Sequence, residues 1–170
     1  YDFSPALEMI DYCKKNSIPI ILTTSKTKPE VLELQKKLQI DFPFIIENGA
    51  GIIIPAQEEL QTIDLGITYD KTIEAFHRYE KLYNMEGFHT MDIERIATLT
   101  GLSLDDAAMA KDRSYGEPFL LEPSKVYIDL RQMARNDGFD IVQGGRFYHL
   151  ITKGIDKANA VQHLIQLYEK

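Results

Sequence analysis

The apolar positions in the first third of the chain switch repeatedly between helical and strand spacing. A Ser-Pro pair, followed by apolar residues that recur on one face, predicts a helix over 4–16. Residues 18–22 form a short apolar run that predicts a buried parallel strand. A second helix is predicted over 29–38, followed by strands at 42–46 and 52–54. Strands and helices that alternate through short turns predict a doubly wound α/β sheet.

The pattern changes after Pro55 and returns to the first type near the end. The middle of the chain predicts helices over 69–83, 93–99, 104–110 and 126–136, a strand at 114–121, and a hairpin of 139–142 and 146–151 about Gly144-Gly145. These elements suit an α+β unit with an open sheet, and a last helix is predicted over 156–168. We therefore expect a core made of residues 1–65 and 153–170, with a small domain, residues 66–152, inserted between them.

Composition excludes several classes of partner. The net charge of −7 argues against general binding to nucleic acid or to an anionic membrane. Cys13 is the single cysteine, so no internal disulfide can form, and a reducing, cytoplasmic location is expected. No run approaches the 18 or so apolar residues of a membrane span, and no signal peptide is visible. Because Tyr1 is no initiator Met, we expect a piece of a longer protein.

A polar cluster follows the first predicted strand. Thr23, Thr24, Ser25 and Lys26 stand where that strand ends and the next helix begins. Ligands of open α/β sheets bind at this carboxyl edge, and backbone N–H groups, hydroxyls and a lysine together suit a phosphate. The alternative interpretation is an ordinary helix cap, which is the commoner role of Ser and Thr before a helix.

Lys157 occupies the start of the last predicted helix. A cation is electrostatically unfavourable there, because the helix dipole favours anions at its N-terminus. A bound anion would make the lysine favourable, and a solvated surface lysine is the alternative.

The inserted domain holds two arginines that could bind a carboxylate in bidentate fashion. Arg113 precedes Glu117, and Arg146 follows Gly144 and Gly145. Ordinary surface ion pairs are the alternative. The four histidines His77, His89, His149 and His163 show no metal-ligand spacing, so they are interpreted as packing or surface residues.

Several segments resemble one family. Residues 20–30 (Ile-Ile-Leu-Thr-Thr-Ser-Lys-Thr-Lys-Pro-Glu) and 45–50 (Ile-Ile-Glu-Asn-Gly-Ala) resemble the second motif region of Cof-type phosphatases of the haloacid dehalogenase superfamily. The tripeptide Ser-Lys-Thr at 25–27 resembles the corresponding motif residues of the mannosyl-3-phosphoglycerate phosphatase branch. Residues 112–119 and 144–149 resemble cap segments of that branch, and 154–161 (Gly-Ile-Asp-Lys-Ala-Asn-Ala-Val) resembles the third motif.

The resemblance implies a fold, a reaction and residue roles. The fold is α/β, a partial Rossmann-like core with an inserted α+β C2-type cap, and the reaction is Mg²⁺-dependent hydrolysis of a phosphomonoester through an aspartyl-phosphate. Thr24 would match the hydroxyl that hydrogen-bonds the transferring phosphoryl group, and Lys157 the lysine that neutralises it. The substrate, a small phosphorylated sugar or glycerate, would meet a set of binding residues: Ser25, Lys26, Asn48, Gly49, Arg113, Glu117, Gly144, Gly145 and Arg146.

The sequence departs from the family at two motifs. The family's Asp-x-Asp-Gly-Thr supplies the nucleophile and the acid/base, and its Gly-Asp motif contributes to the metal site, but the 170 residues contain neither Asp-x-Asp nor Gly-Asp. The nucleophile and the Mg²⁺ ligands are therefore expected outside this chain, and the chain alone is expected to be inactive. Two alternatives remain open: another Cof-type sugar-phosphate phosphatase, and a non-catalytic binding module that retains the cap.

Overall fold

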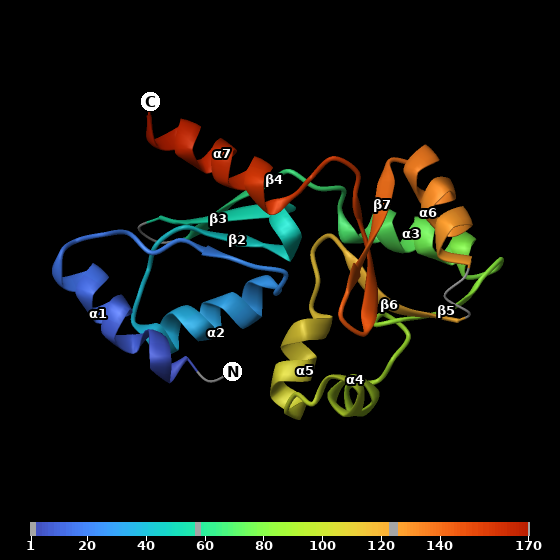
Figure 1. The fold of residues 1–170 in the computed structure, drawn as a ribbon, viewed down its shortest axis with the longest axis horizontal. Helices are drawn as coiled ribbons and strands as arrows, with labels where there is room; N and C mark the ends of the chain where they lie inside the picture. Colours follow the sequence, from blue (N-terminus) through green and yellow to red (C-terminus); the bar gives the residue numbers. More distant parts are fainter. Residues whose placement is uncertain (1–2, 57–58, 123–125, 170) are drawn as a thin grey trace.

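The computed structural model describes residues 3–56, 59–122 and 126–169. Their strands form two four-stranded sheets, one ordered β1-β2-β3-β4 and the other β5-β6-β8-β7, which belong to two lobes (Figure 1). The strands are β1 (Leu22–Thr23), β2 (Phe44–Ile46), β3 (Gly51–Pro55), β4 (Leu60–Asp64), β5 (Asn84–Gly87), β6 (Glu117–Glu122), β7 (Phe139–Gly144) and β8 (Phe147–Thr152). The helices are α1 (Leu7–Lys15), α2 (Lys28–Leu38), α3 (Tyr69–Tyr79), α4 (Ile93–Thr100), α5 (Leu104–Lys111), α6 (Tyr127–Asn136) and α7 (Lys157–Tyr168).

The first sheet is covered by helices on both faces. Successive side chains of a strand point to opposite faces, so Phe44 and Ile46 of β2 pack with Val31 of α2. Ile45, between them, packs with Leu164 of α7 on the other face. All three β2 residues are therefore fully buried, which explains their continuous apolar run. Within this sheet β1 and β2 are parallel, whereas β3 and β4 continue it in antiparallel fashion.

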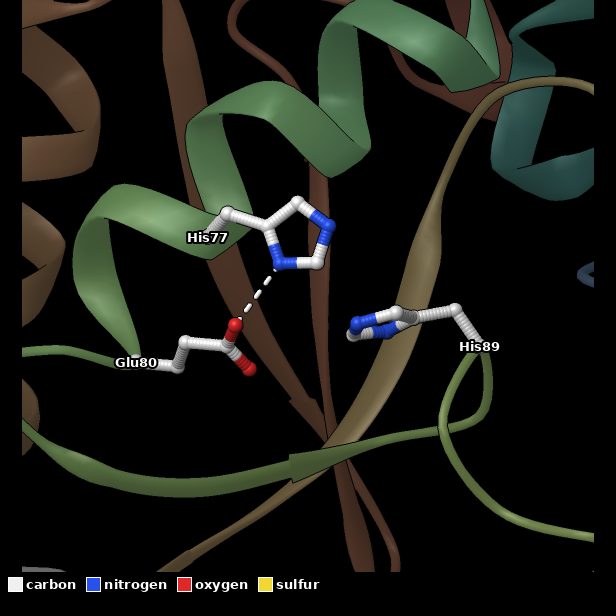
Figure 2. Close-up of side chains that lie close together, drawn as sticks. All are labelled: His77, Glu80 and His89. Atoms are coloured by element: carbon white, nitrogen blue, oxygen red, sulfur yellow. Dashed lines mark hydrogen bonds and ion pairs between the residues drawn. The ribbon is translucent and has the colours of Figure 1, made fainter.

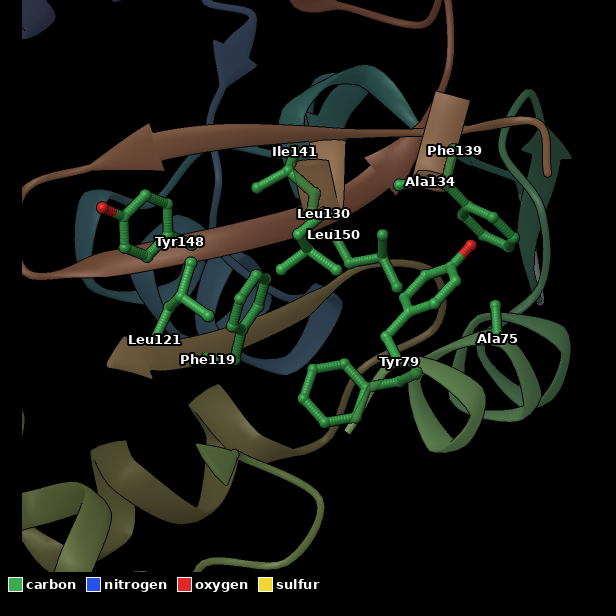
Figure 3. Packing of buried hydrophobic residues seen from close by; sticks show 11 residues of the cluster. Ala75, Tyr79, Phe119, Leu121, Leu130, Ala134, Phe139, Ile141, Tyr148 and Leu150 are labelled. Carbon is green, nitrogen blue, oxygen red and sulfur yellow. The ribbon is translucent and has the colours of Figure 1, made fainter. Parts of the chain in front are cut away.

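The second sheet is antiparallel and buries one face under α3 and α6. Phe119 of β6, Ile141 of β7 and Leu150 of β8 project to this face (Figure 3). Tyr79 of α3 and Leu130 of α6 meet them there, and all five side chains are almost completely buried. A smaller cluster packs α4 and α5 against the opposite face. This antiparallel sheet with helices is the α+β unit that the sequence predicts.

Most predicted elements are present, with differences that have physical causes. The predicted strand over 18–22 is only Leu22–Thr23, because the parallel ladder with β2 pairs these two residues alone. The helix predicted to Tyr83 ends at Tyr79, since the chain then turns into β5. The first predicted helix is present as α1, and its apolar residues are not covered by the described part of the chain: no α1 residue is buried, and Met9 is 65% exposed.

Two strands have no counterpart in the prediction. β4 and β5 are the edge strands of their sheets, and β4 is mostly exposed. β4 buries no residue fully, and β5 (Asn-Met-Glu-Gly) contains no β-branched or aromatic residue, so neither segment carries the pattern from which strands are recognised. The division into residues 1–65, 66–152 and 153–170 stays a prediction. No helix in the described part of the chain is long and apolar enough to cross a membrane.

Candidate active site

Backbone hydrogen bonds bring two polar segments together at the carboxyl end of β1. The Thr24 N–H donates to the Ile45 carbonyl at 3.1 Å, which extends the parallel pairing by one residue. The Asn48 N–H then donates to the Thr24 carbonyl at 2.9 Å, and the Glu47 N–H to the Lys26 carbonyl at 3.0 Å. Residues 24–26 and 47–48 therefore lie side by side, although more than 20 residues separate them in the sequence.

Gly49 fixes the same edge against the start of α7. Its φ is +102°, in the left-handed region that favours glycine. A Cβ atom at this position would lie 2.2 Å from the Asp156 carbonyl oxygen and 3.0 Å from the Lys157 nitrogen. Only glycine therefore permits this approach, which places Lys157 beside the Asn48-Gly49 turn. Three sequence-predicted site segments, 24–26, 48–49 and 157, thus meet at one edge of the sheet.

The polar groups at this edge are partly open. Thr24 Oγ1 accepts a hydrogen bond from the Lys26 N–H at 3.2 Å, and its own O–H donates to no group among residues 3–56, 59–122 and 126–169. Ser25 is exposed. Lys157 is exposed at the first position of α7 and makes no ion pair with the described residues. Lys26, in contrast, is paired through its ammonium with Glu30 at 2.5 Å.

The capping role belongs to a different residue from Thr24. Thr27 is the N-cap of α2: its Oγ1 accepts from the Glu30 N–H, and the Glu30 carboxylate accepts from the Thr27 N–H at 2.9 Å. This reciprocal pair is a capping box. Since Thr27, the residue after the polar cluster, satisfies the helix start, Thr24 is not the helix cap.

Glu47 joins the two lobes, a role that its sequence position does not reveal. Its buried carboxylate accepts from three successive backbone N–H groups of the loop before β6: Ser114 at 2.7 Å, Tyr115 at 3.1 Å and Gly116 at 2.9 Å. The Arg113 guanidinium lies 3.2 Å from the same carboxylate. A buried charge needs such compensation to be tolerated. We call Glu47 with residues 113–116 the interlobe junction.

Arg113 and Glu117 are engaged within the protein. Arg113 is 5% exposed, and its Nε and Nη1 donate to the Gly116 and Ala110 carbonyls in addition to the pair with Glu47. Glu117 is fully buried, and its two oxygens accept from the Tyr69 hydroxyl and from His89. Both side chains are therefore engaged with other described residues, and their part in substrate binding stays a prediction.

The hairpin tip and His149 are also singled out by the sequence. Gly144, Gly145 and Arg146 are exposed at the turn between β7 and β8, and the Arg146 guanidinium donates to the Leu99 carbonyl at the end of α4. Burial, with a smaller contribution from the Arg113 cation, lowers the pKa of His149 to about 4. That histidine is neutral near pH 7 and packs in the sheet, as the sequence predicts.

A cleft of about 400 Å³ lies along β1 and α2 and reaches α5 of the second lobe, and Lys157 is not among its lining residues. Thr24 and Lys26 line it from the first lobe, and Asp106 and Met109 of α5 line it from the second. The lobes also contact each other here, since the Thr27 hydroxyl donates to the Met109 carbonyl at 2.7 Å. The cleft therefore gives a small ligand access to Thr24 between the two lobes.

Comparisons with known proteins identify the family of this chain. The model of a haloacid dehalogenase-like hydrolase family matches residues 4–114. A glucosyl-3-phosphoglycerate/mannosyl-3-phosphoglycerate phosphatase of Persephonella marina is 39% identical over the whole chain, which covers 67% of that relative. The chain belongs to the haloacid dehalogenase-like hydrolase family.

Solved structures show the same fold. Thermoplasma acidophilum 0175 superposes with a TM-score of 0.74 at 21% identity, covering 99% of this chain and 64% of that one. A haloacid dehalogenase-like hydrolase from Bacteroides thetaiotaomicron gives 0.69 at 14% identity, covering 98% and 70%. The chain thus spans about two thirds of the length of these proteins.

Proposed function

We propose that the complete protein is a phosphomonoester hydrolase that acts on mannosyl-3-phosphoglycerate or its glucosyl counterpart and releases inorganic phosphate. The name of the Persephonella marina relative supports this substrate class. One observation supports this most directly: the Thr24 hydroxyl and Lys157, which makes no ion pair with the described residues, belong to segments that Gly49 and Asn48 bring to one sheet edge.

Each of the two residues has a distinct part in the proposed reaction. Thr24 donates a hydrogen bond to an oxygen of the transferring phosphoryl group, and the exposed Lys157 ammonium offsets the charge that this group carries. At an effective dielectric constant of about 20, one such contact at about 4 Å is worth roughly 4 kcal/mol before desolvation. Stabilisation of this kind is what phosphoryl transfer requires from an enzyme.

The edge suits an anion rather than a divalent cation. Magnesium prefers carboxylate oxygens, phosphates and water, whereas the open side chains here are hydroxyls and a lysine. The hydroxyls of Thr24 and Ser25 and the Lys157 ammonium are therefore not the ligands of the metal. We propose that Mg²⁺ and the aspartate that accepts the phosphoryl group are held by residues outside the 170 of this chain.

The carboxylate of the glycerate group needs a second cation. Arg146 is our candidate, since it is exposed and follows two glycines that let a ligand approach the backbone closely. Its guanidinium can hold a carboxylate with two parallel hydrogen bonds. Ser25, Lys26, Asn48 and Gly49 form the phosphate side of the proposed site.

The experiment that tests the function compares the complete protein with this chain alone. We expect the complete protein to release phosphate from mannosyl-3-phosphoglycerate in the presence of Mg²⁺, and to stop when the metal is chelated. The 170-residue chain alone should give no turnover, because none of its side chains is placed to accept the phosphoryl group. Failure of the complete protein to hydrolyse either sugar ester would reject the substrate, and turnover by the chain alone would reject the assigned chemistry.

A further inference from the structure

Three side chains of residue types that commonly bind metals meet on the second lobe, outside the site described above. His77 and Glu80 lie three residues apart at the C-terminal end of α3, and His89 lies in the turn after β5. One donor atom of each lies within 4.8 Å of the other two. Figure 2 shows the His89 ring directed toward His77 and Glu80. The Nδ1 atom of His77 lies 2.7 Å from the Oε1 atom of Glu80.

His89 is held in one orientation by a buried carboxylate. Its Nδ1 lies 2.8 Å from Glu117 Oε1, and its backbone N–H donates to the same oxygen at 2.8 Å. Glu117 is itself fixed, because its Oε2 accepts from the Tyr69 hydroxyl at 2.8 Å. The carboxylate can only accept, so Nδ1 carries the proton and Nε2 presents a lone pair. A histidine held in this way by a carboxylate is the usual arrangement behind a metal ligand.

The Nε2 atom of His89 has no hydrogen-bond partner in the part of the chain that the structure describes, although it is buried. The His89 side chain is 13% exposed, and the rings of Phe76 and His77 meet it edge-on with centroid distances of 5.0 and 5.1 Å. A buried polar atom without a partner is rare in folded proteins and calls for an explanation. A metal ion would accept this lone pair.

We propose that His77, Glu80 and His89 form a site for a divalent transition metal of the zinc class. Two imidazoles and one carboxylate suit such an ion, whereas Mg²⁺ prefers oxygen ligands alone. Zinc bonds of about 2.0–2.1 Å place the ligand atoms of a tetrahedral site about 3.3 Å apart. The three donors are within 4.8 Å of one another, so rotation of the exposed His77 and the partly buried Glu80 side chains closes the site without a change of fold.

The site ties two elements of the second lobe together. The ligands come from the end of α3 and from the turn that follows β5, and a metal bound to three protein ligands keeps a fourth position for water. Its residues lie outside the phosphate edge, so the inference does not depend on the proposed function. His77 and His89 are 12 positions apart, which is why their sequence spacing indicates no metal site.

Isothermal titration of the complete protein with Zn²⁺, in a buffer that contains Mg²⁺, tests the site. We expect each protein molecule to bind one Zn²⁺ ion in its second lobe, and Mg²⁺ should not displace this ion. Zn²⁺ binding should also raise the melting temperature of the second lobe. His77→Ala should weaken Zn²⁺ binding at least tenfold while the lobe stays folded, because the His77 side chain is 49% exposed. Replacing Zn²⁺ with Co²⁺ should give the visible absorption of a tetrahedral ion, which His77→Ala abolishes.

Two further variants separate a metal site from unspecific binding. Glu117→Gln leaves all three ligands in place but removes the carboxylate behind His89, so Zn²⁺ affinity should fall by about 10–100-fold. His163→Ala, which removes a histidine of α7, is the matched control and should bind Zn²⁺ as the wild type does. Absence of Zn²⁺ binding, or equal affinity of the His77→Ala variant and the wild type, would overturn the proposal.

Discussion

Two neighbouring regions of the first lobe use their polar groups in opposite ways. At the interlobe junction the Glu47 carboxylate accepts from three backbone N–H groups and pairs with Arg113, so that all of its capacity is used inside the protein. At the sheet edge, one residue further along, the Asn48-Gly49 turn meets Thr24 and Lys157, whose donors stay open among the described residues.

The difference separates groups that hold the fold from groups that await a ligand. Buried charges are tolerated when fully compensated, and loss of one partner then destabilises the protein. Open donors at a carboxyl edge contribute little to folding, so their removal should leave stability almost unchanged. The following variants test this contrast, from the largest expected effect to the smallest.

Glu47→Ala should cause the largest loss of stability. It leaves the Arg113 cation buried without its carboxylate and three backbone N–H groups without an acceptor. Breaking a buried pair in this way costs about 3–5 kcal/mol. The free energy of unfolding of the complete protein in urea measures it, with Glu33→Ala on the exposed face of α2 as the control. Similar values for the two variants would contradict the role of the junction.

Gly49→Ala should destabilise more than Gly101→Ala. Both glycines have positive φ, +102° and +75°, so both variants carry the cost of a left-handed alanine, about 1–2 kcal/mol. A Cβ atom added at Gly49 would lie 2.2 Å from the Asp156 carbonyl oxygen and would clash with the backbone. A Cβ atom added at Gly101 would meet no atom of the described residues within 4 Å. Overpacking should add about 1–3 kcal/mol to the urea unfolding free energy lost by Gly49→Ala. Equal losses would show that the turn does not press on α7.

Arg146→Ala should reduce kcat/KM about tenfold to a hundredfold for the glycerate substrate, since one buried charge-assisted contact contributes about 1.5–3 kcal/mol. The loss should be far smaller for a phosphate ester without the carboxylate, and Arg146→Lys should restore only part of it. Arg95→Ala, which removes another exposed arginine of the same lobe, is the control. Equal losses on both substrates would assign Arg146 to folding or closure.

Lys157→Gln should change stability only slightly, and in the opposite direction to Glu47→Ala and Gly49→Ala. Removing a cation from the first turn of α7 relieves its repulsion by the helix dipole, which is worth about 0.3–1 kcal/mol at low ionic strength. Lys71→Gln makes the same change in the first turn of α3 and should stabilise similarly. Only Lys157→Gln should also lower activity. A loss of stability on Lys157→Gln would place this lysine among the structural residues.

The sequence predicts the parts of this picture that depend on local pattern. The helices α4, α5 and α7 and the β7–β8 hairpin follow from apolar spacing and turn residues, and the polar segment after β1 is identifiable as an edge site. The interlobe junction is not predictable in this way. The partners of Glu47 are backbone N–H groups 67 to 69 positions further along, and backbone groups leave no mark in residue identity.

The placement of the cap arginines shows a related limit. Arg113 and Arg146 are both sequence candidates for a carboxylate clamp, and the two glycines before Arg146 favour it only slightly. The fold buries Arg113 beside Glu47 and leaves Arg146 exposed on a hairpin tip, and burial depends on long-range packing. The same holds for His77 and His89, which become neighbours only because β5 brings the chain back beside α3.

The open hydroxyl of Thr24 is the central claim, and the kcat of Thr24→Ala in the complete protein tests it most directly. A hydrogen bond that strengthens as charge develops should be lost mainly from kcat rather than KM, by about tenfold to a thousandfold. The free energy of unfolding should change by less than about 0.5 kcal/mol. Thr98→Ala, which removes an exposed hydroxyl on α4, should change neither quantity. An unchanged kcat, or a loss of activity that only follows a loss of stability, would contradict the assignment of this edge as the phosphoryl site.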